Sequence, residues 1–158
     1  MKDTAPDEFY ALLVPLADER LLLPRGCVAE VVSWSEPRQM PGAPPWYVGT
    51  VSWSRRDVPV VSFETVLGRA LPQPAGRTRI VMVHALAGLL GVRHFGILTQ
   101  GFPQLVRVNN DVVKADLERR FPEHVPVLAA VRLVNESPLI PDLELLERLI
   151  ADETRIAS

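Results

Sequence analysis

The stretch from Pro41 to Phe63 constrains the fold most, because it joins residues that forbid helix to residues that favour strand. Its first part is rich in proline, which lacks a backbone N–H and fixes φ, so this part can be neither a helix nor an inner strand. Aromatic and β-branched residues fill 46–53, and a second apolar run fills 58–63. The residues between these runs, 55–57, are charged, and two apolar runs around a polar break predict a β-hairpin.

Short apolar runs bounded by turn residues recur along the rest of the chain. They predict strands at 9–16, 21–24, 27–33, 79–83, 92–98 and 125–134. The 15 prolines and 9 glycines fit a chain with many turns. Each half has strands with a glycine turn, at Gly26 and at Gly101, so we expect a mainly β fold of two small β-barrels side by side. Composition alone leaves a β-sandwich open as the alternative.

Two segments carry helical spacing. Val113, Leu117 and Phe121 recur every four residues and predict a short helix over 112–121. Near the end of the chain, Asp142 precedes an apolar face at helical spacing, which indicates an N-cap. The second of these predicts a C-terminal helix over 142–151.

A connector, LPQPAG, separates the two halves at 71–76, and its prolines and glycine fit an exposed linker. The expected organisation is one domain over 8–152 with tails at 1–7 and 153–158. Within it we expect a first barrel over about 8–71, a connector at 72–76, a second barrel over about 77–141 and the helix at 142–151.

Charge and composition argue against several classes of protein. The net charge is −2, from 17 basic and 19 acidic residues, and gives no general attraction to nucleic acid or to an anionic membrane. The alternative function is that of a nucleic-acid-binding β-barrel, and this balance of charges argues against it. The single cysteine, Cys27, excludes an intrachain disulfide. The chain starts without an apolar signal core and has no run of about 20 apolar residues, so we expect a cytoplasmic protein without membrane insertion.

No pattern of residues indicates an enzyme. None of the three histidines, His84, His94 and His124, lies within a short metal-ligand spacing of another or of Cys27, and no catalytic spacing is recognisable. Glycine-rich phosphate loops are absent as well. We therefore expect no catalytic residue, no cofactor and no metal.

Several aromatic and charged residues are candidates for contact with a protein partner. Trp46 follows two prolines and belongs either to the core or to a partner contact, whereas Trp53 fits the core better. Arg55 and Arg56 in the hairpin turn are either solvated or offer a fork of donors to a partner's carboxylate. Glu30 either protects a barrel edge or forms part of a docking surface.

The hairpin stretch resembles the CheW family of bacterial chemotaxis coupling proteins. The matching residues are Pro41, Gly42, Pro44, Gly49, Val51, Trp53, Val58, Pro59, Val60 and Val61. Further similarities occur in the same order along the chain, namely Val28-x-Glu30, Leu67-Gly68, Gly96-Ile97-Leu98 and the leucine-rich end LIPDLELLERLI. Together they cover about residues 9–150.

The resemblance implies two SH3-like β-barrels packed on a hydrophobic seam and a non-enzymatic adaptor function. Such proteins dock the cytoplasmic tip of a chemoreceptor in the groove between the barrels and contact the regulatory domain of a histidine kinase. The docking positions that carry over to this chain are Val28, Glu30, Gly49, Ser54, Arg55, Ile97 and Leu98.

Two departures from the family pattern bear on the function. Where the family has arginine and then glycine in the turn, this chain has Ser54 and Arg55, and Ser62-Phe63 replaces the usual aspartate and leucine. The Ser62-Phe63-Glu64 ending resembles the divergent auxiliary couplers of the chemosensory systems that run type IV pili and twitching motility. The resemblance therefore implies an accessory coupler.

Overall fold

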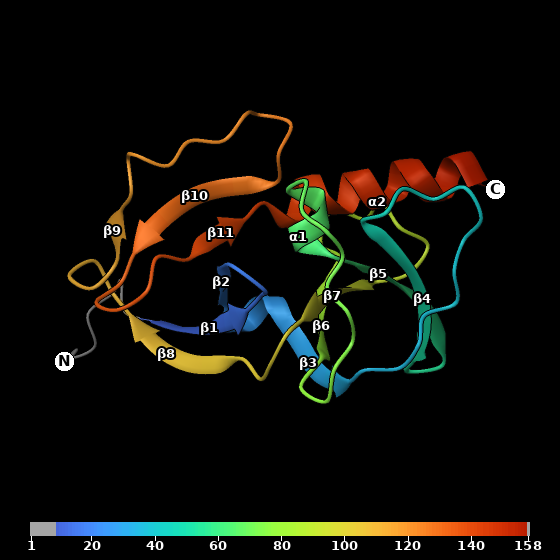
Figure 1. Cartoon of the computed structure of the whole chain (residues 1–158), viewed down its shortest axis with the longest axis horizontal. Coiled ribbons are helices and arrows are strands. Elements are labelled where there is room, and N and C mark those ends of the chain that lie inside the picture. The colour runs from blue at the N-terminus through green and yellow to red at the C-terminus, as the bar shows by residue number, and fades with distance from the viewer. Residues whose placement is uncertain (1–8, 158) are drawn as a thin grey trace.

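The computed structural model describes residues 9–157, which form a mainly β protein with two sheets and a C-terminal helix (Figure 1). The first sheet has the order β8-β1-β2-β11-β10-β9, and its strands are β1 (Phe9–Pro15), β2 (Arg20–Pro24), β8 (Gln104–Val108), β9 (Lys114–Ala115), β10 (Val127–Arg132) and β11 (Leu139–Pro141). The second has the order β3-β6-β7-β5-β4, with β3 (Val28–Ser33), β4 (Tyr47–Trp53), β5 (Arg56–Val61), β6 (Arg79–His84) and β7 (His94–Thr99). The helices are the 3-10 turn η1 (Arg25–Cys27), α1 (Phe63–Val66) and α2 (Leu143–Ala157). The predicted tail 1–7 lies outside the described residues.

The predicted hairpin is confirmed. Strands β4 and β5 pair antiparallel, and their last pair, Trp53 with Arg56, leaves a two-residue turn at Ser54 and Arg55. The turn is thus one residue earlier than the charged break suggested. Val58, Val60 and Val61 are buried in β5, as the second apolar run indicated.

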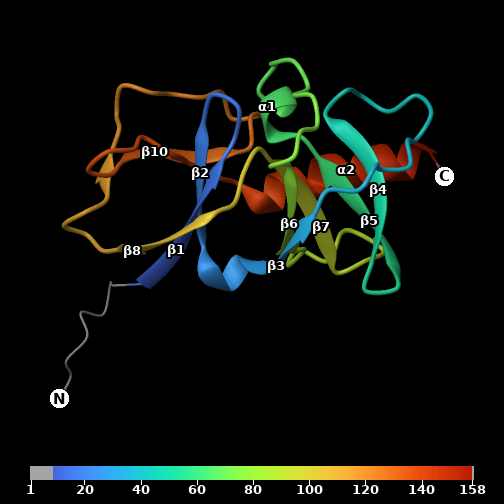
Figure 2. The same cartoon turned by 60° about the horizontal axis from the view of Figure 1, so that its bottom comes forward.

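The expected barrel boundaries, 8–71 and 77–141, do not coincide with the two sheets. Strands β1 and β2 come from the first half of the chain but pair with β8 and β11 from the second half. Strands β6 and β7 make the opposite exchange and join β3 and β5. Figure 2 shows part of this mixing, with blue β1 beside yellow β8. Local patterns predict strands, but pairing between distant strands leaves no local mark.

The helix predictions had different outcomes. Helix α2 begins where expected, because the side chain of Asp142 accepts a hydrogen bond from the Leu145 amide at 3.0 Å, and it continues to Ala157 rather than ending at residue 151. The predicted helix over 112–121 is wrong. Asn109 Oδ1 accepts hydrogen bonds from two following amides, and the Asp116 amide pairs with the Ala130 carbonyl. A side-chain turn and pairing with β10 therefore replace helical bonds there.

The core consists of a large apolar cluster between the sheets and two smaller ones. The large cluster combines Val14, Leu16, Leu21, Leu23, Ala130 and Leu139 of the first sheet region with Tyr47, Val61, Phe63, Val81, Val83, Phe95 and Ile97 of the second, and with Leu146 and Ile150 of α2. Each smaller cluster belongs to one sheet. The protein therefore has two subdomains held together by a shared apolar seam that α2 helps to cover.

Candidate docking surface

Val28 and Glu30 were expected on one face of β3, but a β-bulge between them places them on opposite faces. Val28 pairs with Val83, which belongs to the large cluster between the sheets, whereas Glu30 pairs with Met82 of the second sheet's own cluster. Directly opposed residues point to the same side of a sheet. The expectation of a shared face is therefore corrected, because the bulge shifts the alternation by one residue.

Glu30 takes part in a chain of contacts at one end of the second sheet. Its Oε1 accepts a hydrogen bond from Trp53 Nε1 at 3.0 Å. The Trp53 ring packs edge-on against His94 at 4.8 Å, and His94 lies 5.0 Å from His84, its partner across β6 and β7. Burial, followed by the nearby charges of His84 and Arg93, lowers the pKa of His94. Trp53 is thus half-buried against the core, as expected, and its polar edge is held by Glu30.

The hairpin turn next to Trp53 has an unusual backbone. Ser54 and Arg55 have φ values of 51° and 65°, a left-handed conformation that glycine and asparagine adopt most readily. Both side chains are exposed and stand at the end of the second sheet. The two residues are therefore placed where a partner can reach them.

Of the remaining expected docking positions, Trp46 is half-buried and the others are buried. Ile97 and Leu98 are 0% and 4% exposed in β7, so their side chains offer no surface to a partner. Trp46 is half-buried against the large cluster, with its ring 6.2 Å from that of Tyr47.

Gly49 is also buried, and the fold itself requires a glycine there. Its φ is +144°, and a Cβ would lie 2.5 Å from the Arg38 carbonyl oxygen. Arg38 and Thr50 exchange backbone hydrogen bonds of 2.8 and 3.0 Å, which lay the proline-rich loop against β4. The family pattern at Gly49 therefore has a structural explanation in this chain.

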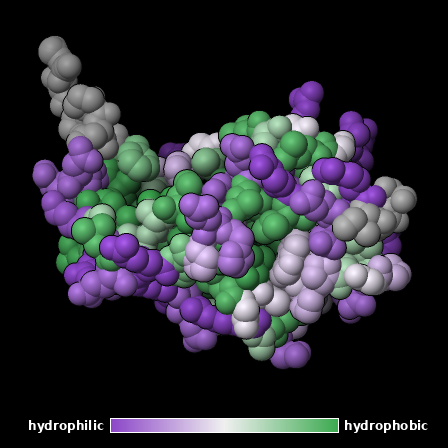
Figure 3. All heavy atoms as spheres, turned by 90° about the horizontal axis from the view of Figure 1, so that it is seen from above, coloured by the Kyte–Doolittle hydropathy of each residue, from purple (hydrophilic) through white to green (hydrophobic). Residues whose placement is uncertain are grey.

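A groove lies where the two subdomains and α2 meet, with a volume of about 730 Å³. We call it the junction groove. It is lined by Leu23, Pro24, Cys27, His84, Leu86, Ala87, Glu123, Leu128, Ile140, Pro141, Asp142, Leu143, Glu144, Leu145, Glu147 and Arg148. Leu86 is 81% exposed and Leu128 66% exposed, although both are large and apolar. Figure 3 shows apolar side chains between polar ones on the face along which α2 runs.

The loop that carries Leu86 follows β6 and is held in place by a buried carboxylate. Glu147 of α2 is 1% exposed, and its two oxygens accept hydrogen bonds from the Ala87 and Leu89 amides at 3.0 and 2.8 Å. Because these two backbone amides bond to a buried carboxylate, the loop is anchored to α2 while Leu86 stays exposed. Leu86 is therefore presented to solvent by a rigid support.

Cys27 and His84 both line the junction groove, but nothing there indicates catalysis. Burial raises the pKa of the Cys27 thiol, which disfavours the reactive thiolate. Across residues 9–157 the structure gathers no group of three or more side chains suited to holding a metal ion.

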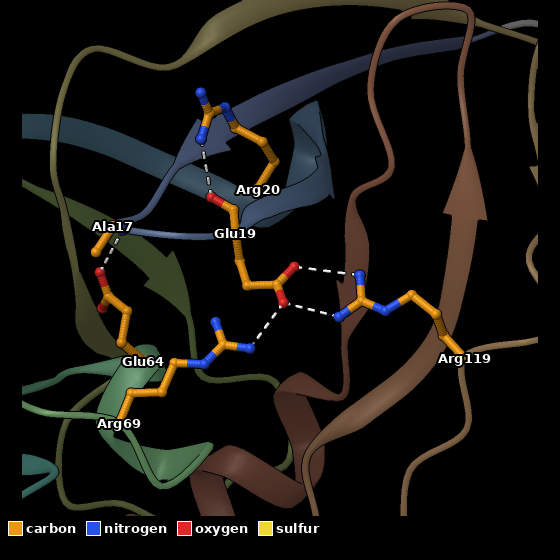
Figure 4. A network of polar contacts seen from close by, with 6 residues as sticks. All are labelled: Ala17, Glu19, Arg20, Glu64, Arg69 and Arg119. Carbon is orange, nitrogen blue, oxygen red and sulfur yellow. Dashed lines mark hydrogen bonds and ion pairs between the residues drawn. The ribbon is translucent and has the colours of Figure 1, made fainter.

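A second polar network ties the two subdomains together, as Figure 4 shows. Glu19, in the turn between β1 and β2, is 8% exposed and accepts hydrogen bonds from Arg119 at 2.7 Å and Arg69 at 3.0 Å. Beside it, Glu64 accepts the Ala17 amide at 2.9 Å. Burial by itself raises the pKa of Glu19, but the hydrogen bonds and charges of the two arginines outweigh it, so the pKa lies below its ordinary value.

Sequence reasoning missed the residues that shape these surfaces. Glu19 and Glu147 read as ordinary surface carboxylates, because their partners lie 50 to 100 residues away. Leu86 is part of an apolar run, ALAGLL, within a turn region, and this run is the one sequence signal of the exposed loop.

The family comparison covers most of this architecture. The CheW-like domain matches residues 10–149, which include both sheets and the start of α2. The chain belongs to the CheW-like domain family. The CheW resemblance of the hairpin stretch is thus confirmed over nearly the whole chain.

A solved structure agrees with the family assignment. The CheW-like chain is similar to the scaffolding protein TtCheW from Thermoanaerobacter tengcongensis, with a TM-score of 0.75 and 16% identity over 92% of each chain. That likeness confirms the two-subdomain β fold. No curated protein matches the chain by sequence. Among the described residues, no helix combines the length and apolar character that crossing a membrane requires.

Proposed function

We propose that this CheW-like protein is a non-enzymatic adaptor that joins the cytoplasmic tip of a chemoreceptor to the regulatory domain of a histidine kinase. The observation that carries the proposal is the pair of exposed leucines, Leu86 and Leu128, on the junction groove. An adaptor needs apolar surface that stays outside the core, and contiguous exposed apolar residues mark interaction sites in soluble proteins. Membership of the CheW-like domain family supports this class of partner.

The junction groove suits a helical receptor tip. An amphipathic helix binds by laying its apolar face in a hydrophobic groove. The apolar floor would supply most of the binding energy, while Glu123, Asp142 and Glu144 on the lining would set its orientation. Because these side chains are acidic, a receptor segment with lysine or arginine beside its apolar face fits best. Arg148 is the basic residue of the lining, and its partner is Glu144 at 3.6 Å.

We propose further that the protein is an accessory coupler, of the kind that serves type IV pilus and twitching systems. The support is Ser54, which stands where the family has an arginine. A hydrogen bond to a charged group is worth roughly 1.5–3 kcal/mol and a neutral one about 1 kcal/mol. Since about 1.4 kcal/mol changes affinity tenfold, loss of that contact predicts weaker coupling to the kinase.

The test uses two leucines with similar exposure. Leu86→Glu places a charge on the junction groove, whereas Leu117→Glu places one at a site that is 76% exposed and does not line the groove. With a soluble receptor fragment and the kinase, we expect Leu86→Glu to reduce receptor capture at least about tenfold, because it adds an unpaired charge to an apolar contact. Leu117→Glu should bind like the wild type. A wild-type protein that joins neither receptor nor kinase would refute the proposal.

A further inference from the structure

Two arginines line a second, smaller hollow at the hairpin end of the second sheet. It has a volume of about 230 Å³ and is lined by Trp53, Ser54, Arg56, Val58, Gly91, Val92, Arg93 and His94. We call it the arginine hollow. Arg56 is the first residue of β5 and Arg93 directly precedes β7, so two distant segments supply its positive charge. Arg55 directly precedes Arg56, in the hairpin turn, and does not itself line the hollow.

These three arginines differ from most others in the described part of the chain. Arg38, Arg69, Arg119 and Arg132 each lie within 3.2 Å of a carboxylate oxygen. Arg55, Arg56 and Arg93 are exposed, and no carboxylate of residues 9–157 pairs with them. A group of like charges left without counterions raises the local potential and attracts an acidic partner.

The wall of the arginine hollow is rigid and aromatic. The indole N–H of Trp53 donates a hydrogen bond to Glu30, and the ring packs edge-on against His94. Val58 packs beneath it and is 1% exposed. A rigid ring beside two guanidinium groups suits a carboxylate on a short apolar stem, because the stem contacts the ring while the oxygens meet the arginines.

The backbone of the turn is an independent indication of function. Hairpin turns with positive φ at both central residues favour Asn-Gly, whereas this chain keeps Ser54 and Arg55 at φ 51° and 65°. Such a conformation costs of order 1 kcal/mol or more for residues other than glycine, and costs of this kind concentrate at binding sites. A glycine at position 55 would lower the cost but remove the guanidinium.

We propose that the arginine hollow binds an acidic segment of a partner protein, with one carboxylate held between Arg56 and Arg93 and a second near Arg55. The inference rests on the proposed function for the class of partner, a signalling protein. Nucleic acid fits less well, because the hollow offers one aromatic ring rather than a row of stacking rings, and the chain has a net charge of −2. The apolar junction groove is a separate surface, lined by different residues.

The experiment titrates the full chain with an N-acetylated hexaglutamate peptide and, as its neutral counterpart, hexaglutamine, observed by ¹⁵N–¹H NMR. We expect hexaglutamate to shift the Trp53 indole signal and the amides of 54–56 and 91–94, and hexaglutamine to leave them unchanged. Binding should weaken strongly between about 50 mM and about 500 mM salt, because the shorter Debye length screens exposed charges.

Charge-removing variants then locate the site. Arg56→Gln and Arg93→Gln should each weaken hexaglutamate binding about five- to tenfold, since each removes one charge-assisted contact. Arg77→Gln is the matched control. Arg77 is exposed and lies just before the start of β6, whereas His84 is at the other end of that strand. The NMR spectrum of each variant shows whether its fold is intact, so a loss of binding that results from misfolding can be recognised.

Three results would overturn the inference. The first is an equal loss of binding in Arg77→Gln, and the second is unchanged binding in both Arg56→Gln and Arg93→Gln. The third is tighter binding of an oligothymidine of equal charge at the same signals, which would make the site one for nucleic acid. If hexaglutamate fails while Leu86→Glu still abolishes receptor capture, this inference alone falls. If hexaglutamate binds while the wild type joins no receptor to the kinase, the coupling role falls and the site stands.

Discussion

Arg119 Nη2 lies 2.7 Å from the Glu19 carboxylate, although the two residues are 100 positions apart. Glu19 also accepts from Arg69 at 3.0 Å, so one nearly buried carboxylate joins the β1–β2 turn to segments that follow α1 and β9. The two arginine side chains are 32% and 39% exposed, which weakens each pair through solvent screening. The three-residue arrangement nevertheless satisfies a carboxylate that the fold has removed from water.

Glu19→Gln should lower the free energy of unfolding by about 1–3 kcal/mol. Glutamine keeps the shape but removes the negative charge that accepts three hydrogen bonds from Arg69 and Arg119, and it turns one oxygen into a donor that faces arginine. Urea unfolding measures the change. Glu36→Gln is the control, because Glu36 is exposed, and it should change stability by no more than about 0.5 kcal/mol. Equal values for the two variants would show that the network contributes nothing.

The same carboxylate predicts an acid dependence. The folded-state pKa of Glu19 is lowered, so its contribution to stability is present above the unfolded-state pKa of about 4.3 and is lost as the pH falls through the lower folded value. The wild type should therefore lose stability on acidification faster than Glu19→Gln. Unfolding curves between about pH 6 and pH 3 test this, and parallel curves for the two proteins would contradict it.

Gly49→Ala should destabilise the protein by about 1–3 kcal/mol or more. The new Cβ would meet the Arg38 carbonyl oxygen at 2.5 Å, and the φ of +144° is unfavourable for any side chain. Gly76→Ala is the control, because a Cβ at Gly76 meets nothing within 4 Å. We expect that variant to be neutral or slightly stabilising. If partner binding falls in Gly49→Ala without a loss of stability, Gly49 has a direct docking role after all.

Glu30→Lys should weaken partner binding and leave the fold intact. Glu30 is exposed, so the change should cost little stability beyond its hydrogen bond to Trp53, about 1 kcal/mol. Binding of hexaglutamate at the arginine hollow should not weaken, because the new lysine adds a cation beside it. Pull-down of the receptor fragment and of the kinase measures the effect, with Glu36→Lys as the control. Unchanged capture of both partners would remove this surface from the proposed function.

Ser54 and Arg55 make the accessory role testable in a reconstituted kinase assay. If the family's arginine contact is lost in this chain, Ser54→Arg should raise kinase activation several-fold, up to about tenfold. Arg55→Ala should then leave activation unchanged. Strong activation by the wild type that Arg55→Ala abolishes would show that the charge has moved along the turn and that the accessory reading is wrong.

Local chemistry predicted much of this fold. The prolines before Trp46 and the apolar runs around Arg55 were enough for the hairpin, and Asp142 marked the start of α2. The helix expected at 112–121 failed because spacing alone ignored Asn109, whose side chain competes for the amides that a helix needs. Leu117 is accordingly 76% exposed rather than part of a core face.

The site was harder to predict because it depends on long-range pairing. The bulge in β3 separates Val28 from Glu30, and strict alternation could not reveal it. Ile97 and Leu98 matched a family motif, yet their burial follows from β7 lying in the middle of its sheet. Arg56 already stood out in the sequence as a possible donor to a partner's carboxylate, but Arg93 did not, because the two residues come to line one hollow only after β5 and β7 have paired.

The exchange of strands between the two halves bears on how the chain is made. While a ribosome has released only the first 70 residues, β1 and β2 have neither β8 nor β11 to pair with, and β3 lacks β6. Such a nascent chain exposes unpaired strand edges and core leucines until the second half emerges. Because both sheets close through contacts of long sequence separation, folding is expected to follow translation of the whole domain and to be slow for its size.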